Sequence, residues 1–170
     1  MTIRESADAD RNAWDGFLAT QRTGSFYHLF GWQEVVCRRL GHQTSYLMAC
    51  DAERVTGVLP LTYVTSRLFG RILCSVPFMN YGGPCAESAE VSNRLVAAAV
   101  EKARELGADY LELRCAMPLE TELPVSLRKV SMTIALNPDP DVLWNAFTSK
   151  HRKNVRRAAK NGLEVRVGGI

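Results

Sequence analysis

The chain has 170 residues, of which 46% are hydrophobic and 23% are charged, values that are ordinary for one well-buried globular domain. The net charge is only +3, but six of the 21 basic residues lie between Lys150 and Lys160, and the rest of the chain has a net charge of −3. The positive charge is therefore local. It argues for a localised site and against a protein that coats nucleic acid along its whole surface.

The cysteines predict reduced thiols, because they are odd in number, widely spaced and without a C-x-x-C pair. They are Cys37, Cys50, Cys74, Cys85 and Cys115. The three histidines have no metal-ligand spacing, so neither a metal nor a cofactor is expected. The polar N-terminus is no secretory signal, and no apolar run reaches the roughly 20 residues that span a bilayer. We therefore expect a cytoplasmic location.

The first part of the chain predicts two helices. Residues 10–20 form a short helix, and its apolar face holds Trp14, Phe17 and Leu18. Residues 25–41 contain a second helix that ends at Gly41. Apolar residues recur along it at helical spacing, namely Trp32, Val35, Val36 and Leu40.

Strand patterns follow. Residues 44–50 and 54–67 predict two strands of a hairpin, which turns at Asp51–Glu53. Residues 67–78 supply another strand. Residues 80–85, with the sequence NYGGPC, predict a loop because glycine and proline punctuate them.

Residues 88–107 give the clearest helical pattern, with Ser88 as the N-cap and Gly107 as the stop. One face of this helix carries Val91, Leu95, Ala99 and Leu106. Residues 109–115 and 129–136 then predict strands. In the first of these we expect the inward side chains to be Leu111, Leu113 and Cys115.

Residues 139–162 predict one long helix, capped by Asp139, with Pro140 at its first position and Gly162 at its end. Residues 163–167 predict a closing strand. Helices interspersed with strands indicate an α/β domain around a mixed sheet. A strand needs a neighbour, so we expect the chain to be the front part of a longer protein.

The last helix places its cations on one side, because a turn contains 3.6 residues. These are Lys150, Lys153, Arg157 and Lys160, with Arg156 beside them. An apolar side holds Leu143, Phe147, His151, Val155 and Ala158 or Ala159. Like charges three or four residues apart repel by roughly 0.2–0.5 kcal/mol per pair. Two interpretations stay open: a solvated or internally neutralised face, and a face that binds a phosphate-bearing substrate or RNA.

Several motifs are missing from the sequence. It has no P-loop, no G-x-G-x-x-G and no G-x-S-x-G elbow. Residues 38–43 and 67–72 half-match the R-x-x-G-x-G/A loop that holds the acetyl-CoA pyrophosphate in common acetyltransferases, but both lack the last small residue. This argues against acetyl-CoA binding. The aromatic residues are too scattered to predict a base-stacking platform.

Three segments together resemble the FemAB family of non-ribosomal peptidyltransferases, which have acetyltransferase-like (GNAT) folds. These segments are FYHLFGWQEVV, PFMNYGGPCAES with YLELR after it, and LWNAFTSKHRKNVRRAAKNGLEVRV. The sequence is most similar to the branch associated with exosortase (PEP-CTERM) and exopolysaccharide gene clusters. The closing S-K-x-R-x-x-V-R-R-A-x-K-x-G pattern and YGGP are its markers. The resemblance covers the first half of a typical family member.

The resemblance implies a GNAT-like mixed β-sheet flanked by helices. It implies an N-terminal domain over 1–137, and a basic helix and strand over 138–170 that lead into a second GNAT-like half. The implied activity is transfer of an aminoacyl or other acyl group to an amine on a peptidoglycan or exopolysaccharide precursor. The implied partners carry phosphate: an aminoacyl-tRNA, or a nucleotide-linked or lipid-linked precursor. No DNA partner is expected.

The resemblance also suggests site residues. The expected phosphate-positioning residues are Lys150, Arg152, Lys153, Arg156 and Arg157, with Arg38 and Arg39 as second candidates. Two interpretations of Tyr81, Gly82 and Gly83 stay open: a wall of the substrate cleft, since the glycines allow close backbone approach, and a plain tight turn. No general base is assigned, because Asp109 and Glu112 read as surface residues of a half-buried strand.

Two other functions stay open. The chain is then either a binding module that holds RNA or another anion without chemistry, or a structural half that braces a catalytic partner domain. An RNA-binding module would show a salt slope of about −0.7 to −0.9 per phosphate contacted.

Overall fold

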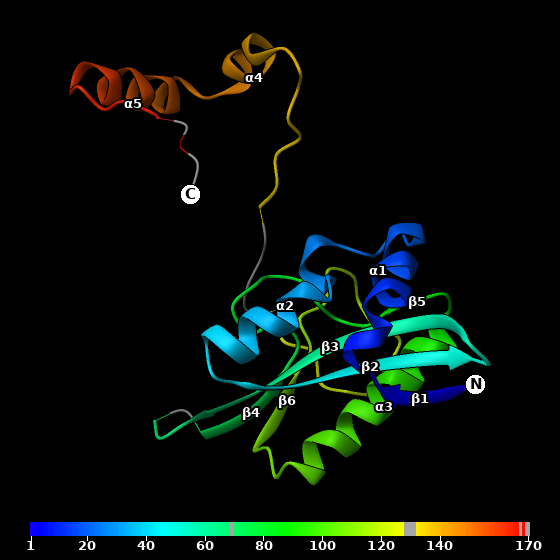
Figure 1. The fold of residues 1–170 in the computed structure, drawn as a ribbon. Helices are drawn as coiled ribbons and strands as arrows, with labels where there is room; N and C mark the ends of the chain where they lie inside the picture. The colour runs from blue at the N-terminus through cyan, green and yellow to red at the C-terminus, as the bar shows by residue number, and fades with distance from the viewer. Residues whose placement is uncertain (69, 128–131, 167, 169–170) are drawn as a thin grey trace. The chain divides into compact units, whose positions relative to one another are not determined.

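The computed structural model describes residues 1–68, 70–127, 132–166 and 168 (Figure 1). It divides into two compact units, Met1–Leu123 and Pro124–Ile170, which are described separately below. Among the described residues, no helix combines the length and the apolar character that crossing a membrane requires.

The described residues of unit 1 form a six-stranded mixed sheet. Its strands are β1 (Thr2–Glu5), β2 (Gln43–Asp51), β3 (Arg54–Ser66), β4 (Gly70–Cys74), β5 (Cys85–Ala86) and β6 (Tyr110–Glu112). The order is β1-β2-β3-β4-β6, and the short β5 pairs with β3. The β4–β6 pair is parallel, whereas the others are antiparallel. β1 was not predicted from the sequence.

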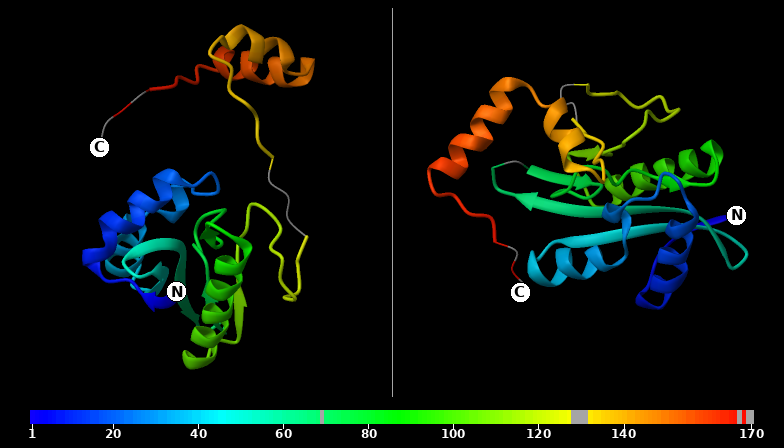
Figure 2. Two further views of the ribbon diagram at one scale, coloured as in Figure 1. Left: turned by 90° about the vertical axis from the view of Figure 1, so that its right-hand side faces the viewer. Right: turned by 90° about the horizontal axis from the view of Figure 1, so that it is seen from above.

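Helices cover both faces of this sheet (Figure 2). Because side chains alternate along a strand, β2 sends Tyr46, Met48 and Cys50 to one cluster and Leu47 and Ala49 to the other. The first cluster packs against α1 (Arg11–Thr20), and the second packs against α3 (Ala89–Glu105). The predicted α/β class, a mixed sheet flanked by helices, is confirmed.

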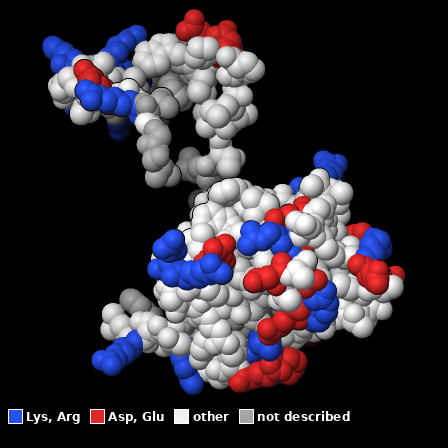
Figure 3. Space-filling model, in the orientation of Figure 1, with Lys and Arg blue, Asp and Glu red and all other residues white. Residues whose placement is uncertain are grey.

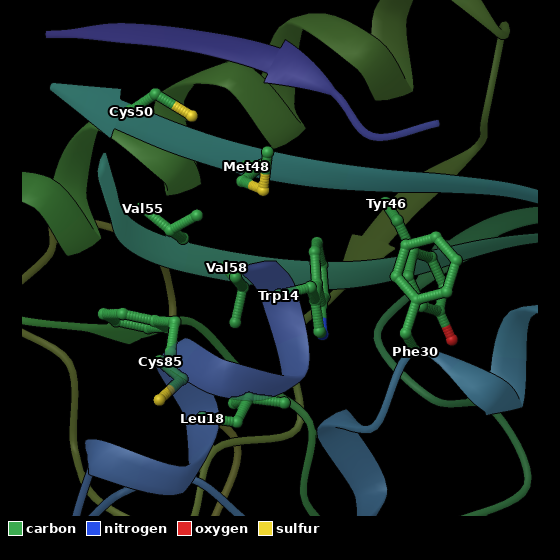
Figure 4. Close-up of a cluster of buried hydrophobic side chains, with 10 residues drawn as sticks. Trp14, Leu18, Phe30, Tyr46, Met48, Cys50, Val55, Val58 and Cys85 are labelled. Atoms are coloured by element: carbon green, nitrogen blue, oxygen red, sulfur yellow. The ribbon is translucent and has the colours of Figure 1, made fainter. Parts of the chain in front are cut away.

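Trp14 lies at the centre of the α1 side (Figure 4). Its side chain is fully buried, stacks on Tyr46 with ring centroids 5.2 Å apart, and meets the edge of Phe30 at 5.7 Å. Its indole nitrogen donates a 2.8 Å hydrogen bond to the carbonyl oxygen of His28. The predicted apolar face of this helix is confirmed, because Phe17 and Leu18 are also buried.

Several local predictions are confirmed. The β2–β3 hairpin turns through Ala52 and Glu53, with Ala52 at a φ of +53°. Ser88 caps α3, since its side-chain oxygen accepts a hydrogen bond from the Val91 amide. Gly41, at a φ of +72°, follows the second helical run as its predicted stop.

The predicted apolar face of that second run is largely wrong. The chain forms the short helix α2 (Gly31–Glu34) and continues as the π-helical segment η3 (Val35–Arg39). Val36 is buried, but Val35 and Leu40 are exposed and Trp32 is half-buried. A π-helical turn is wider than an α-helical turn, so it moves side chains off the stripe that a 3.6-residue period predicts.

Unit 2 contains two helices where the sequence predicted one. They are α4 (Pro140–Ala146) and α5 (Ser149–Lys160). Thr148 is extended, with ψ of 156°, and its hydroxyl accepts a hydrogen bond from the His151 amide, so it starts a new helix as an N-cap. The predicted cap at Asp139 and the stop at Gly162 are confirmed.

The two strands predicted after Leu123 are not formed where the structure describes them. Residues 132–136 and 163–166 are irregular, whereas 129–131 and 167 lie outside the described residues. A strand is stabilised by hydrogen bonds to a neighbour. The described part of unit 2 offers these segments no neighbouring strand.

The two tryptophans of unit 1 should differ sharply in their effect on stability. We expect Trp14→Ala to lower the free energy of unfolding by about 3–5 kcal/mol, because it leaves a cavity in a packed core. Trp32→Ala should cost about 1 kcal/mol or less, since its ring is half-buried. Urea unfolding of both variants measures this, and equal losses would contradict the assigned core.

Candidate functional site

The α5 helix carries six cations without carboxylate partners. Among the described residues, no carboxylate lies within ion-pair distance of Lys150, Arg152, Lys153, Arg156, Arg157 or Lys160. Figure 3 shows their blue side chains gathered over α5, whereas blue and red intermix on the visible face of unit 1. The described structure therefore does not neutralise this charge internally.

Arg152 has a structural role within unit 2. Its Nη1 atom donates to the carbonyl oxygens of Phe147 at 2.8 Å and Asn145 at 3.2 Å, and it lies 3.5 Å from that of Trp144. A cation suits this place, because the last carbonyl groups of a helix lack partners and carry partial negative charge. Arg152 thus fastens the end of α4 to α5, and its predicted contact with phosphate remains a prediction.

Helix stability explains only some of the remaining cations. Arg156 lies over the ring of Trp144, with its guanidinium carbon 5.4 Å from the centroid, which is a cation–π contact. Arg157 and Lys160 suit the negative end of the helix dipole. Lys150 and Lys153 stand in the first half of α5, where the dipole disfavours positive charge. An anionic ligand would offset this cost.

The segment Tyr81–Gly82–Gly83 is fixed inside unit 1. The amides of Gly82 and Gly83 donate to the carbonyl oxygen of Arg114 at 2.9 and 3.0 Å. A Cβ atom would come within 2.4 Å of Val76 at Gly82 and within 2.5 Å of the Cys115 sulfur at Gly83. Packing against the protein itself therefore explains both glycines. Their predicted place in a substrate cleft remains a prediction.

Arg114, which sequence reasoning did not single out, holds the same loop with its side chain. Its Nη1 atom donates to the carbonyl oxygens of Val76 at 3.3 Å, Pro77 at 2.6 Å and Met79 at 3.0 Å. Val76 is buried at a φ of +44°, a strained conformation for a β-branched residue. An arginine near the end of the alternating segment 109–115 was the only signal in the sequence. It gives no hint of a loop that lies nearly 40 residues earlier.

His28 fastens the loop from the other side. Its Nε2 atom lies 2.8 Å from the Gly83 carbonyl oxygen, and its Nδ1 atom lies 2.8 Å from the Ser25 hydroxyl. A carbonyl oxygen only accepts, so Nε2 carries the proton and Nδ1 accepts from Ser25. Burial lowers the pKa of His28, which keeps the ring neutral. No signal in the sequence predicted this role of His28.

These contacts disfavour pyrophosphate at the loop between β4 and α3. In common acetyltransferases the phosphate-binding loop lies between a strand and a helix, and backbone amides there face the anion. Here the Gly82 and Gly83 amides donate hydrogen bonds to the Arg114 carbonyl oxygen, and the Glu87 amide donates to the Thr56 carbonyl oxygen. Glu87 and Glu90 also put negative charge at the start of α3.

The other predicted charged residues have mixed surroundings. Arg38 is paired with Glu34 at 3.1 Å, whereas Arg39 is exposed and has no ion-pair partner in the described part of the chain. Asp109 accepts from the Arg71 amide at 2.8 Å and from its guanidinium at 3.0 Å. These two hydrogen bonds lower the pKa of Asp109, which makes it a weak base.

Aromatic residues gather more closely than the sequence predicted. The ring centroid of Phe26 lies 6.1 Å from that of Tyr27 and 5.3 Å from that of Trp32. The ring centroids of Tyr27 and Tyr81 are 6.4 Å apart. The prediction of scattered aromatics is therefore wrong on this side of unit 1. Tyr81 is far from the others in sequence. It comes close to Tyr27 because of the fold of the loop that contains Gly82 and Gly83, named the glycine loop below.

The described residues include no metal-binding cluster, and burial disfavours thiolate formation at Cys74 and Cys115. No group of three or more His, Cys, Asp or Glu residues there is placed to hold a metal ion. Burial raises the pKa of the Cys74 and Cys115 thiols to about 11, so neither forms a thiolate readily at neutral pH.

The buried His28 predicts a specific pH dependence of stability. Its pKa is lowered in the folded state, whereas an unfolded histidine titrates near 6.5. The unfolded state therefore binds a proton first, and stability falls as pH drops below about 6.5, by up to about 1.4 kcal/mol per pH unit. We expect His28→Gln to lose this component in urea unfolding between pH 7 and 5, whereas His151→Gln, at an exposed position of α5, should keep it. Identical pH profiles for His28→Gln and the wild type would contradict the buried neutral ring.

Comparison with models of protein families and with curated proteins finds no match. Solved structures do match. A ribosomal-protein-alanine N-acetyltransferase from Brucella melitensis biovar Abortus 2308 is 14% identical, with 80% of this chain and 100% of that chain covered, at a TM-score of 0.54. The aminoglycoside 6'-N-acetyltransferase AAC(6')-IG from Acinetobacter haemolyticus is 12% identical, with 79% and 100% covered, at 0.51. FemX is 18% identical over 64% of this chain and 25% of that chain, at 0.45. The first two likenesses show that the chain has the fold of GNAT acetyltransferases.

Proposed function

We propose that the chain is the N-terminal part of a FemAB-type acyltransferase and that α5 positions a phosphate-bearing substrate. The observation that carries this proposal is the set of α5 cations without carboxylate partners among the described residues. The GNAT fold is compatible with acyl transfer, and the sequence resemblance points to the exosortase-associated branch. An aminoacyl-tRNA is the donor in this proposal, and a cytoplasmic location is part of it.

The proposed reaction moves an acyl group from an ester to an amine. The amine nitrogen attacks the ester carbonyl carbon, a C–N bond forms, and the C–O bond breaks as the leaving oxygen takes up the proton that the amine nitrogen loses. The acceptor is an amine on a peptidoglycan or exopolysaccharide precursor. The cations of α5 bind and orient phosphate through charge-assisted hydrogen bonds and take no part in the bond changes. We assign no general base among the described residues.

A second function is a binding module for RNA without chemistry. It is favoured by the fact that no described side chain of unit 2 is buried, which leaves α5 and the half-buried Trp144 available to a large polyanion. The two functions differ in ligand preference. A transferase part should distinguish a nucleotide-linked sugar from free nucleotide, whereas an RNA module should bind tRNA alone, with a steep salt dependence.

The double variant Lys153→Ala/Arg157→Ala tests the α5 site. These residues lie four apart on the same side of α5, and neither contacts α4 through a described hydrogen bond. We expect tRNA affinity to fall about tenfold or more at low salt. The slope of log K against log salt should become shallower by about 1.4–1.8, for two lost phosphate contacts. Fluorescence anisotropy over a salt series measures both, and a UDP-linked sugar is tested in parallel.

The matched control removes the same charge elsewhere. Arg22→Ala/Arg67→Ala deletes two exposed arginines of unit 1 that form no described ion pair. It should leave affinity and slope near the wild-type values. Equal losses in the two variants would show a non-specific charge effect and reject the α5 site. Circular dichroism confirms that both variants remain folded.

A further inference from the structure

An exposed apolar patch lies beside α2 on unit 1. It consists of Phe26, Leu29, Trp32 and Val35, named the α2 patch below. Phe26 is 64% exposed, Leu29 37% and Val35 39%. With Gly31 these side chains line a shallow hollow of about 200 Å³. The patch is absent from the core clusters, so the packing of unit 1 does not account for it.

The patch offers apolar contact and nothing to orient a small ligand. The only side-chain polar atom in it, the indole nitrogen of Trp32, already donates to the Phe26 carbonyl oxygen at 3.0 Å. The rings of Phe26 and Trp32 meet edge to face at 5.3 Å, which holds them in place. Ligand pockets combine larger cavities, of roughly 300–1,000 Å³, with a few placed polar groups. A small-molecule site is therefore disfavoured here.

The size of the patch also disfavours a standard protein interface. Such interfaces bury roughly 20–30 residues on each side. The α2 patch has four side chains. A lipid surface sets no such minimum, because each inserted side chain contributes separately to the partition. Exposed aromatic and aliphatic residues on a short helical segment match the composition of interfacial membrane anchors.

The charges beside the patch fit an anionic surface. Unit 1 as a whole has 12 basic and 15 acidic residues, a net charge of −3. Residues 21–50, which contain the patch, have three arginines and one acidic residue, Glu34. Glu34 is neutralised by Arg38 at 3.1 Å and by Arg11 at 3.7 Å. Arg39 is exposed and follows Val35 by one turn.

We propose that the α2 patch docks unit 1 onto an anionic lipid surface. The four apolar side chains enter the boundary between headgroups and acyl chains, and Arg39, which has no ion-pair partner among the described residues, faces lipid phosphates. This inference uses neither α5 nor the glycine loop, so it stands apart from the proposed acyl transfer. It concerns a protein that lies on the membrane surface and does not cross it.

Vesicle co-sedimentation of the full chain tests the docking. The probe is phosphatidylcholine vesicles with and without phosphatidylglycerol. We expect binding to the anionic vesicles, and Phe26→Glu should weaken the partition about tenfold or more. The matched control is Leu68→Glu, which places the same charge on an apolar residue that is 81% exposed on the β3–β4 connection. It should bind as the wild type does. Wild-type protein that stays in the supernatant would overturn the proposal, as would equal binding by both variants.

Attraction of vesicles to α5 alone must be separated from insertion of the patch. In a Trp144→Phe background the remaining tryptophans are Trp14, which is fully buried, and Trp32. Brominated lipid should quench Trp32 fluorescence, and Lys153→Ala/Arg157→Ala should leave this quenching in place. Unquenched fluorescence, with sedimentation that the α5 variant abolishes, would overturn the proposal. A third result would also overturn the proposal: a wild-type protein that does not bind vesicles but self-associates, with Phe26→Glu abolishing the self-association. The patch would then be a protein interface.

Discussion

Arg114 is the residue on which the loop of residues 76–83 depends. Its carbonyl oxygen accepts the amides of Gly82 and Gly83, and its guanidinium donates to three carbonyl groups of residues 76–79. Its own amide donates to the Ser75 hydroxyl at 2.8 Å. One residue therefore satisfies five backbone polar groups of this loop, including groups of the buried residues Val76, Gly82 and Gly83. These bonds also offset the strain at Val76, which is of order 1–3 kcal/mol.

This internal use of the loop has a consequence for anion binding. A glycine-rich turn before a helix can present its amides to phosphate, but an amide that already donates to a carbonyl group would have to break that bond first. His28 also stabilises this loop, because its ring donates a hydrogen bond to the Gly83 carbonyl oxygen. In the proposed function, phosphate is therefore bound by side chains, and α5 offers cations that the described carboxylates leave unpaired.

Local signals predicted much of the fold. The Ser88 cap, the apolar stripe of α1 and the two-residue hairpin each depend on neighbours within a few residues, so the sequence shows them directly. The break at Thr148 also has a local cause, an N-cap residue inside a helical pattern, but the pattern alone does not say which signal prevails. The π-helical turn in η3 has no clear sequence signature.

The hydrogen bonds that Arg114 and His28 make to the glycine loop could not be predicted from the sequence, because they join residues that are far apart in the chain. Arg114 binds carbonyl groups about 35–38 positions away, and His28 binds Gly83 across 55 positions. Neither pairing follows from periodicity or composition. The strands predicted after Leu123 failed for a related reason, since alternation shows that a segment suits a strand but not that a partner strand is present.

The two groups of exposed cations differ in their apolar surroundings, and this difference separates their proposed ligands. α5 has one large aliphatic residue, Val155, among its twelve residues, so the attraction of an anion to it is almost wholly electrostatic and falls steeply with salt. Arg38 and Arg39 stand next to the α2 patch, where apolar insertion adds a contribution that salt does not screen. A soluble phosphate ester suits the first surface, and a lipid surface suits the second. Salt dependence is therefore the property that distinguishes the two proposed modes of anion recognition within one chain.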